Sequence, residues 1–148
     1  MGQSVFIDLT GIKKLQNFMK RVGNSYRKAE AIYDELEDIA IDMRNFIIDG
    51  MTNTPKMSRG YKRGNHVHFP SKPGEMPAID QGGIVKLLGH QTSMKGVEFG
   101  VRQGAPYAEL LEDGTNKMDA RPIIQPTIDH FDPWMEQRLW LKIKEVTK

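Results

Sequence analysis

Two histidines stand in the pattern of half a metal site. His66 and His68 are two residues apart, so they would share one face of a strand. The carboxylate nearest to them along the sequence is Glu75, and we assign no other to this pair. A zinc site needs three or four ligands in a fixed geometry. We therefore expect a solvated loop and no metal. His90 and His130 have no flanking carboxylate pattern and are expected to be structural or exposed.

Three acidic residues stand in the pattern of acid/base chemistry. Glu109 and Glu112 are three apart on an expected short helix, followed by Asp113. Neither glutamate lies in an apolar run that would raise its pKa, so we expect a solvated helix face or a contact with a partner. No serine has the glycine flanks of a nucleophile elbow. The glycines from Gly60 to Gly64 lack the following Lys of a phosphate loop. The sequence thus predicts no catalytic residue and no cofactor.

Length and composition indicate one globular domain. The chain has 148 residues and no cysteine, so one domain spanning 1–148 is expected, without disulfides or cysteine-bound zinc. No apolar run approaches the roughly 20 residues of a membrane helix, and the first residues lack the pattern of a secretory signal. We expect synthesis in the cytosol and no membrane partner.

Helical periodicity is strongest in residues 26–50. Apolar side chains recur there at steps of three and four, as on the buried stripe of a core helix, and Asn53-Thr54-Pro55 ends the pattern. A weaker pattern predicts a helix over residues 8–21, within an N-terminal helix-and-cap region of residues 1–25. A last amphipathic helix follows Pro122, buries Ile124, Ile128, Phe131, Met135 and Leu139, kinks at Pro133, and frays after Leu141.

Alternating residues predict a small antiparallel sheet. Residues 90–94 and 97–102 are expected to pair across a tight turn at Lys95-Gly96, with Val97, Phe99 and Val101 facing the long helix. A short helix over residues 79–88, capped by Asp80, precedes them. The predicted fold class is α+β, with the sheet packed against the long helix and the C-terminal amphipathic helix.

Residues 56–78 form a Gly- and Pro-rich stretch without helical period, in which Val67 and Phe69 could form a short strand. A structureless loop of this length is unusual in a compact domain and often marks a binding arm. We predict that residues 56–78 are a mobile loop that becomes ordered on assembly, and that 56–72 show little amide-exchange protection in the free protein.

Charge is separated along the chain. Residues 26–50 carry three basic and seven acidic residues, whereas residues 56–72 carry five basic residues and no acid: Lys56, Arg59, Lys62, Arg63 and Lys72. This polarity suits contact between copies or with another protein. Contact with DNA is the alternative, since Tyr61 and Phe69 lie among the cations, as in single-strand binders.

Residues 105–126 form a compact element with Pro106 at a helix start and Gly114 at its end. Tyr107, Leu110 and Leu111 are expected to face inward. Arg121 before Pro122 is expected to form a bidentate clamp with Glu109 or Glu112 that locks the turn to the last helix. On that basis Arg121→Ala would destabilise the turn and block assembly.

Five segments together resemble the HK97 gp10-like family of tailed-bacteriophage proteins. They are P-G-E-M-P-A at 73–78, Asp80-x-Gly82, a strand pair ending in Gly100-Val101-Arg102, P-Y-A-E-L-L-E-D-G-T at 106–115, and M-D-A-R-P-I-I at 118–124. The chain departs from the family pattern in two apolar positions: Gly83-Ile84-Val85 stands where Leu soon follows the Asp-x-Gly, and Ile123 stands where Phe is favoured.

The resemblance implies a structural component of the neck or tail end of a virion, assembled in the host cytoplasm, with no catalytic residues. It implies an α+β fold and a ring of copies, with six-fold symmetry, bound to neighbouring neck, head-closure or tail-tube proteins. The matching residues proposed for assembly are Tyr107, Glu109, Leu111, Glu112, Gly114, Thr115, Arg121 and Pro122. A nucleic-acid-binding packaging or regulatory factor that uses residues 56–72 is the alternative.

Overall fold

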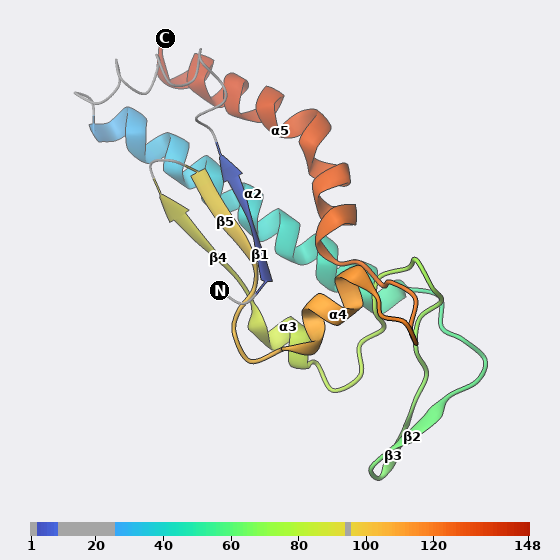
Figure 1. Ribbon diagram of the computed structural model, residues 1–148. Coiled ribbons are helices and arrows are strands. Elements are labelled where there is room, and N and C mark those ends of the chain that lie inside the picture. Colours follow the sequence, from blue (N-terminus) through green and yellow to red (C-terminus); the bar gives the residue numbers. More distant parts are fainter. Residues whose placement is uncertain (1–2, 9–25, 94–95) are drawn as a thin grey trace.

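The computed structural model describes residues 3–8, 26–93 and 96–148. The fold is α+β, as predicted. Strands β1 (Gln3–Asp8), β5 (Gly96–Val101) and β4 (Leu88–Ser93) form an antiparallel sheet in the order β1-β5-β4. Helix α2 (Tyr26–Asn53) packs against β4 and β5, and α5 (Ile124–Val146) packs along α2 (Figure 1).

The long helix has the predicted position and buried face. Its stripe contacts the sheet and α5, because side chains three and four residues apart lie on one side of a helix. The buried residues are Ile32, Leu36, Ile39, Ala40, Met43, Ile47 and Met51. The helix ends just before Thr54-Pro55, since a residue before proline disfavours helical angles.

The sheet confirms the predicted alternation on β5. Val97, Phe99 and Val101 are at most 2% exposed and belong to the core. Strand β1 was not predicted; it pairs antiparallel with β5, from Gln3 opposite Val101 to Asp8 opposite Gly96. The helix predicted over 8–21 is wrong at Asp8, which ends β1, and its other residues lie outside the described part. The turn residues 94–95 also lie outside it.

The two short helices lie at one end of the sheet. Helix α3 (Gly83–Leu87) begins after Gly82, whose φ of 73° is left-handed, so Asp80 is not its cap as predicted. Helix α4 (Tyr107–Asp113) follows Pro106 and ends at Gly114, as predicted.

Helix α5 runs through Pro133 and bends in its first half (Figure 1). Ile124, Phe131 and Leu139 are buried as predicted, and Ile143 is also buried, so the prediction that the end frays after Leu141 is wrong. Arg138 on α5 bonds Glu35 and, at 2.6 Å, Asp42 on α2. No helix within the described residues is long and apolar enough to cross a lipid bilayer.

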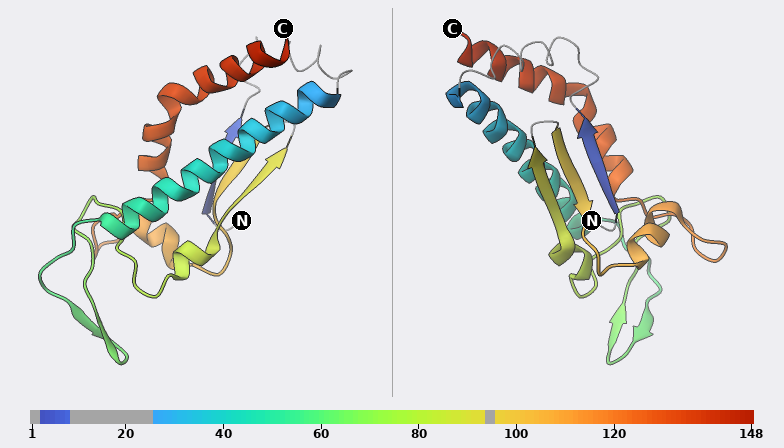
Figure 2. Two further views of the ribbon diagram at one scale, coloured as in Figure 1. Left: turned by 180° about the vertical axis from the view of Figure 1, so that it is seen from behind. Right: turned by 60° about the vertical axis from the view of Figure 1, so that its left-hand side comes forward.

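Residues 56–72 form a hairpin arm rather than a structureless loop. Strands β2 (Tyr61–Arg63) and β3 (His66–His68) pair antiparallel around Gly64, and Lys56 bridges Ser71 at the base. The expected short strand at Val67 is present but ends before Phe69. The arm projects from the body beyond the end of α2 (Figures 1 and 2). Its mobility in solution stays a prediction.

Candidate functional site

Strand alternation gives the hairpin arm two different faces. Tyr61 lies opposite His68, and Arg63 lies opposite His66, on the face that turns toward the body. Lys62 and Val67 form a pair on the other face, which we call the outer face. The arm therefore presents polar aromatic and cationic groups inward, and a cation beside an apolar side chain outward.

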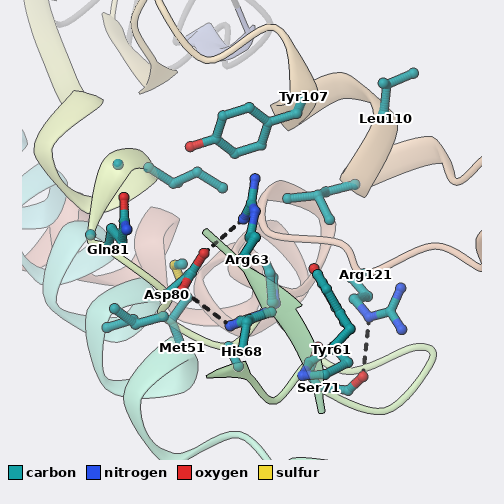
Figure 3. Close-up of a pocket in the computed structure, with 18 of the residues that line it drawn as sticks. Met51, Tyr61, Arg63, His68, Ser71, Asp80, Gln81, Tyr107, Leu110 and Arg121 are labelled. Carbon is teal, nitrogen blue, oxygen red and sulfur yellow. Dashed lines mark hydrogen bonds and ion pairs between the residues drawn. The ribbon is translucent and has the colours of Figure 1, made fainter. Parts of the chain in front are cut away.

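The inner face of the arm borders an open cleft of about 950 Å³. Its other walls are residues 77–84, helix α4 and the turn that follows α4. Figure 3 shows Tyr107 and Leu110 on α4 across from Arg63 and Asp80. The described residues that line the cleft from the α4 side are Tyr107, Leu110, Leu111, Thr115, Met118 and Arg121.

Asp80 holds the arm to the body. Its carboxylate lies 2.7 Å from Arg63 Nη1, 2.7 Å from His66 Nε2 and 3.4 Å from His68 Nδ1. Burial raises the pKa of Asp80, but the hydrogen bonds from His66 and Arg63 and the positive charges of His68 and His66 outweigh burial and lower it. Asp80 is therefore an ionised anchor for three residues of the arm.

The two histidines of the His-x-His pattern do not lie in a freely solvated loop. The His68 side chain is only 11% exposed, and burial lowers the pKa of its ring, although the negative charge of Asp80 partly opposes this. Their carboxylate partner is Asp80 and not Glu75. Among the described residues, no group of three or more His, Asp or Glu side chains has an arrangement that would hold a metal ion.

Glu112 caps the last helix and forms no clamp with Arg121. Its two carboxylate oxygens accept hydrogen bonds from the backbone N–H groups of Ile123 at 2.7 Å, Ile124 at 3.0 Å and Gln125 at 2.9 Å. Free N–H groups at a helix start attract a carboxylate by hydrogen bonding and by the helix dipole. The predicted ion pair is wrong because the backbone donors of α5 occupy this carboxylate.

Arg121 instead binds backbone carbonyl groups. Its Nε donates to the Ser71 carbonyl at 3.1 Å, and its Nη1 donates to the Asp119 carbonyl at 3.3 Å. Its own N–H donates to the Leu111 carbonyl at 2.6 Å. Arg121 thus joins the turn after α4 to the base of the hairpin arm, and not to the last helix.

The apolar residues of α4 are distributed differently from the prediction. Tyr107 and Leu110 are 42% and 51% exposed, whereas Ala108 is buried and Leu111 is half-buried. The Tyr107 hydroxyl reaches α3, where a methyl group on Gly83 would lie only 2.7 Å from it. The expectation that Tyr107 and Leu110 face the core is wrong, because both line the open cleft.

The rest of the proposed assembly motif builds the turn after α4. Thr115 and Met118 exchange two backbone hydrogen bonds, and the half-buried Pro122 leads from Arg121 to the start of α5. Glu109 is exposed and has no hydrogen bond or ion pair within the described part of the chain, so it does not belong to this framework.

The cations of the arm differ in whether they form an ion pair. Arg63 pairs with Asp80, but Lys56, Arg59, Lys62 and Lys72 are exposed and form no ion pair with any described residue. The alternation also separates Tyr61, which faces the cleft, from Lys62 on the outer face. The predicted motif and the predicted basic stretch therefore meet at one end of the molecule.

Sequence reasoning did not identify Asp80 as a site residue. The available signals were the His66-x-His68 spacing and the Asp80-x-Gly82 segment, but nothing in the chain order shows that these segments meet. Comparisons of the chain with protein-family models, with curated proteins and with solved structures gave no match.

Proposed function

We propose that this chain is a structural protein of a tailed phage or prophage particle, where it joins head to tail or completes the tail end as a subunit of a ring. The observation that carries the proposal is spatial. Segments that carry the family resemblance, 77–78, 80–82, 106–115 and 118–121, contribute residues to the walls of one cleft beside the basic arm. Because the segments that resemble the family lie together on one exposed surface, we infer that this surface has a binding role in common with the family.

Exposed apolar side chains around this end support a protein partner. Tyr61, Val67, Phe69, Tyr107 and Leu110 are between 42% and 56% exposed. Exposed apolar and aromatic groups rimmed by charge are typical of surfaces that a partner covers. We therefore assign this end to contacts with copies of the chain and with the adjacent neck, head-closure or tail-tube proteins.

The ionisable groups at this end also favour a structural role over an enzymatic one. Asp80 anchors the arm, Glu112 caps α5, and Arg121 donates to two carbonyl groups. Each charge is used in holding the fold together. The proposed location is the neck or tail of the virion, after assembly in the host cytoplasm.

Disruption of the gene tests this function. In the phage or prophage that carries it, a stop codon early in the reading frame should leave separate heads and tails, or tails with an unfinished end, in electron micrographs of the lysate. Supply of the chain in trans should restore joined particles. Normal, infectious particles in the absence of the chain would contradict the proposal.

A nucleic-acid-binding factor is the competing assignment, and a salt titration separates the two. If four arm cations neutralise phosphates, the affinity for duplex DNA should fall with a log–log slope near −4, since each phosphate contributes about −0.9. The structural role predicts weak binding without such a slope. Binding in the micromolar range or tighter with that slope would favour the competing assignment.

A further inference from the structure

The exposed side of α2 carries a row of acidic residues. Glu30, Asp34, Asp38 and Asp42 are spaced by four and are all exposed, so they lie along one side of the helix. Asp42 also pairs with Arg138 at 2.6 Å, whereas the other three form no ion pair with described residues. Ile41 is 43% exposed beside Asp38 and Asp42. We call these four acids and Ile41 the acidic row.

The described residues offer no oppositely charged partner to the other three acids of the row, Glu30, Asp34 and Asp38. Like charges four residues apart destabilise a helix by roughly 0.2–0.5 kcal/mol a pair. A cationic surface laid along α2 would offset this repulsion and would also cover Ile41. The row therefore calls for a partner with several cations and some apolar area.

The outer side of the hairpin arm has this composition. Val67 and Phe69 are 56% and 44% exposed, and both would touch a methyl group placed on Gly60, so they lie together. Lys62 pairs with Val67 on the same face, and Lys56, Arg59 and Lys72 are exposed toward the arm's base. The arm thus has exposed apolar side chains among cations, and the acidic row has an exposed apolar side chain among acids, so the two surfaces are complementary in charge and in apolar area.

The two surfaces lie apart along the molecule. The row runs from near the N-terminal end of α2 to just past its middle, while the arm follows the C-terminal end and points away from the helix (Figures 1 and 2). At 1.5 Å per residue, the row lies roughly 16–35 Å from the last residue of α2, Asn53. The arm of one molecule therefore reaches the row of another more readily than its own.

We propose that the outer face of the hairpin arm, together with the exposed cations Lys56, Arg59 and Lys72 toward its base, binds the acidic row on α2 of a second copy of this chain. The contact uses two different patches, so it is heterologous and repeats from copy to copy, and it gives a ring where the rotation closes. This inference rests on the proposed ring function and adds the surfaces through which the subunits join.

Reciprocal charge reversal tests the contact. One variant carries Lys56→Glu, Arg59→Glu and Lys62→Glu; the other carries Asp34→Lys and Asp38→Lys. Each alone should assemble at least tenfold more weakly than the wild type in sedimentation velocity. An equimolar mixture should recover assembly, since each reversed arm then meets a reversed row and each native arm a native row. Circular dichroism of both variants verifies folding.

A matched control uses two exposed acids outside the arm, the cleft and the acidic row: Asp49 on α2 and Asp132 on α5. Asp49→Lys with Asp132→Lys should assemble like the wild type. Wild-type assembly that neither reversal weakens, or a mixture that fails to recover, would overturn the contact and leave the proposed function standing. A wild-type chain that stays monomeric would contradict both the contact and the ring. Loss of duplex-DNA binding with intact assembly in the arm variant would assign the arm to nucleic acid and overturn the inference.

Discussion

Individual carboxylates decide how the segments of this chain are joined. Glu112 accepts three backbone N–H groups at the start of α5, Asp80 accepts from Arg63 and His66 on the arm, and Glu37 accepts from His90 and Thr92 on β4. In each case the partner lies on another element. These acids therefore hold the fold together, whereas the sequence predicted a solvated or partner-facing helix at Glu112 and a helix cap at Asp80.

Removal of the cap on α5 should be costly. Glu112→Ala leaves backbone N–H groups at the helix start without their acceptor, and should lower the free energy of unfolding by about 1–2 kcal/mol. Glu109→Ala removes an exposed glutamate three residues before Glu112 on α4. This change should alter the free energy of unfolding by less than about 0.5 kcal/mol. Urea denaturation of both variants measures the difference. Equal effects would show that the cap contributes nothing.

The bond between Glu37 and His90 should make stability depend on pH. Hydrogen bonds from His90 and Thr92 lower the pKa of Glu37 below its usual 4.5. The unfolded chain then binds a proton more readily than the folded chain, so this stabilisation is full above pH 4.5 and is lost as pH falls through the lowered pKa. Because the Glu37 side chain is 47% exposed, solvent screening limits the effect to roughly 0.5 kcal/mol.

Thermal unfolding of Glu37→Gln between pH 3 and 7 tests this. The variant should lose stability less steeply on acidification than the wild type. Asp49→Asn, at an exposed acid further along α2 and outside the acidic row, should keep the wild-type slope. Identical slopes for wild type and Glu37→Gln would contradict the assignment.

At the scale of the elements, the sequence predicts the helices and strands that bury a long face in the core. It does not predict the elements that are held by a few short contacts. Helix α2 and strand β5 bury long periodic faces, so their patterns are unambiguous. The arm pairs only three residues with three, and it is held by Asp80, 14 residues beyond His66. Such a contact has no periodic signature. The hydrogen-bond partners of Arg121 and the exposure of Tyr107 also depend on which distant segments come together in space, and no sequence pattern predicts this.

The turn after α4 should not accept a side chain at Gly114. A methyl group there would lie 2.8 Å from the Ala120 nitrogen and 3.0 Å from the Met118 oxygen, and φ is +74°. Gly64 in the arm also has a positive φ, +60°, but has open space around it. Gly114→Ala should therefore cost about 1–2 kcal/mol more than Gly64→Ala, which adds only the backbone strain. Equal melting temperatures would count against this packing.

The anchor at Asp80 should determine how firmly the arm is held. Asp80→Asn removes the charge that attracts Arg63 and His66, so amides of β2 and β3 should exchange roughly tenfold faster than in the wild type, while α2 is unchanged. Asp113→Asn, at an exposed acid of α4, is the control. Unaltered exchange in the arm of Asp80→Asn would show that other contacts hold it.

At the scale of the whole molecule, charge and apolar exposure are arranged along its length. One end carries the basic arm and the cleft, whereas the acidic row lies along the first half and the middle of α2, away from the arm (Figure 2). A subunit with complementary surfaces suits repetition. The fold class followed from the sequence, but this polarity could be seen only after the elements were placed in space.

Electron microscopy of the purified wild-type chain is the most direct test of a ring-forming subunit. Class averages at physiological ionic strength should show closed rings of one diameter and one subunit number, and these should dissociate when the salt concentration is raised. A uniform population of monomers at every protein concentration would contradict the account.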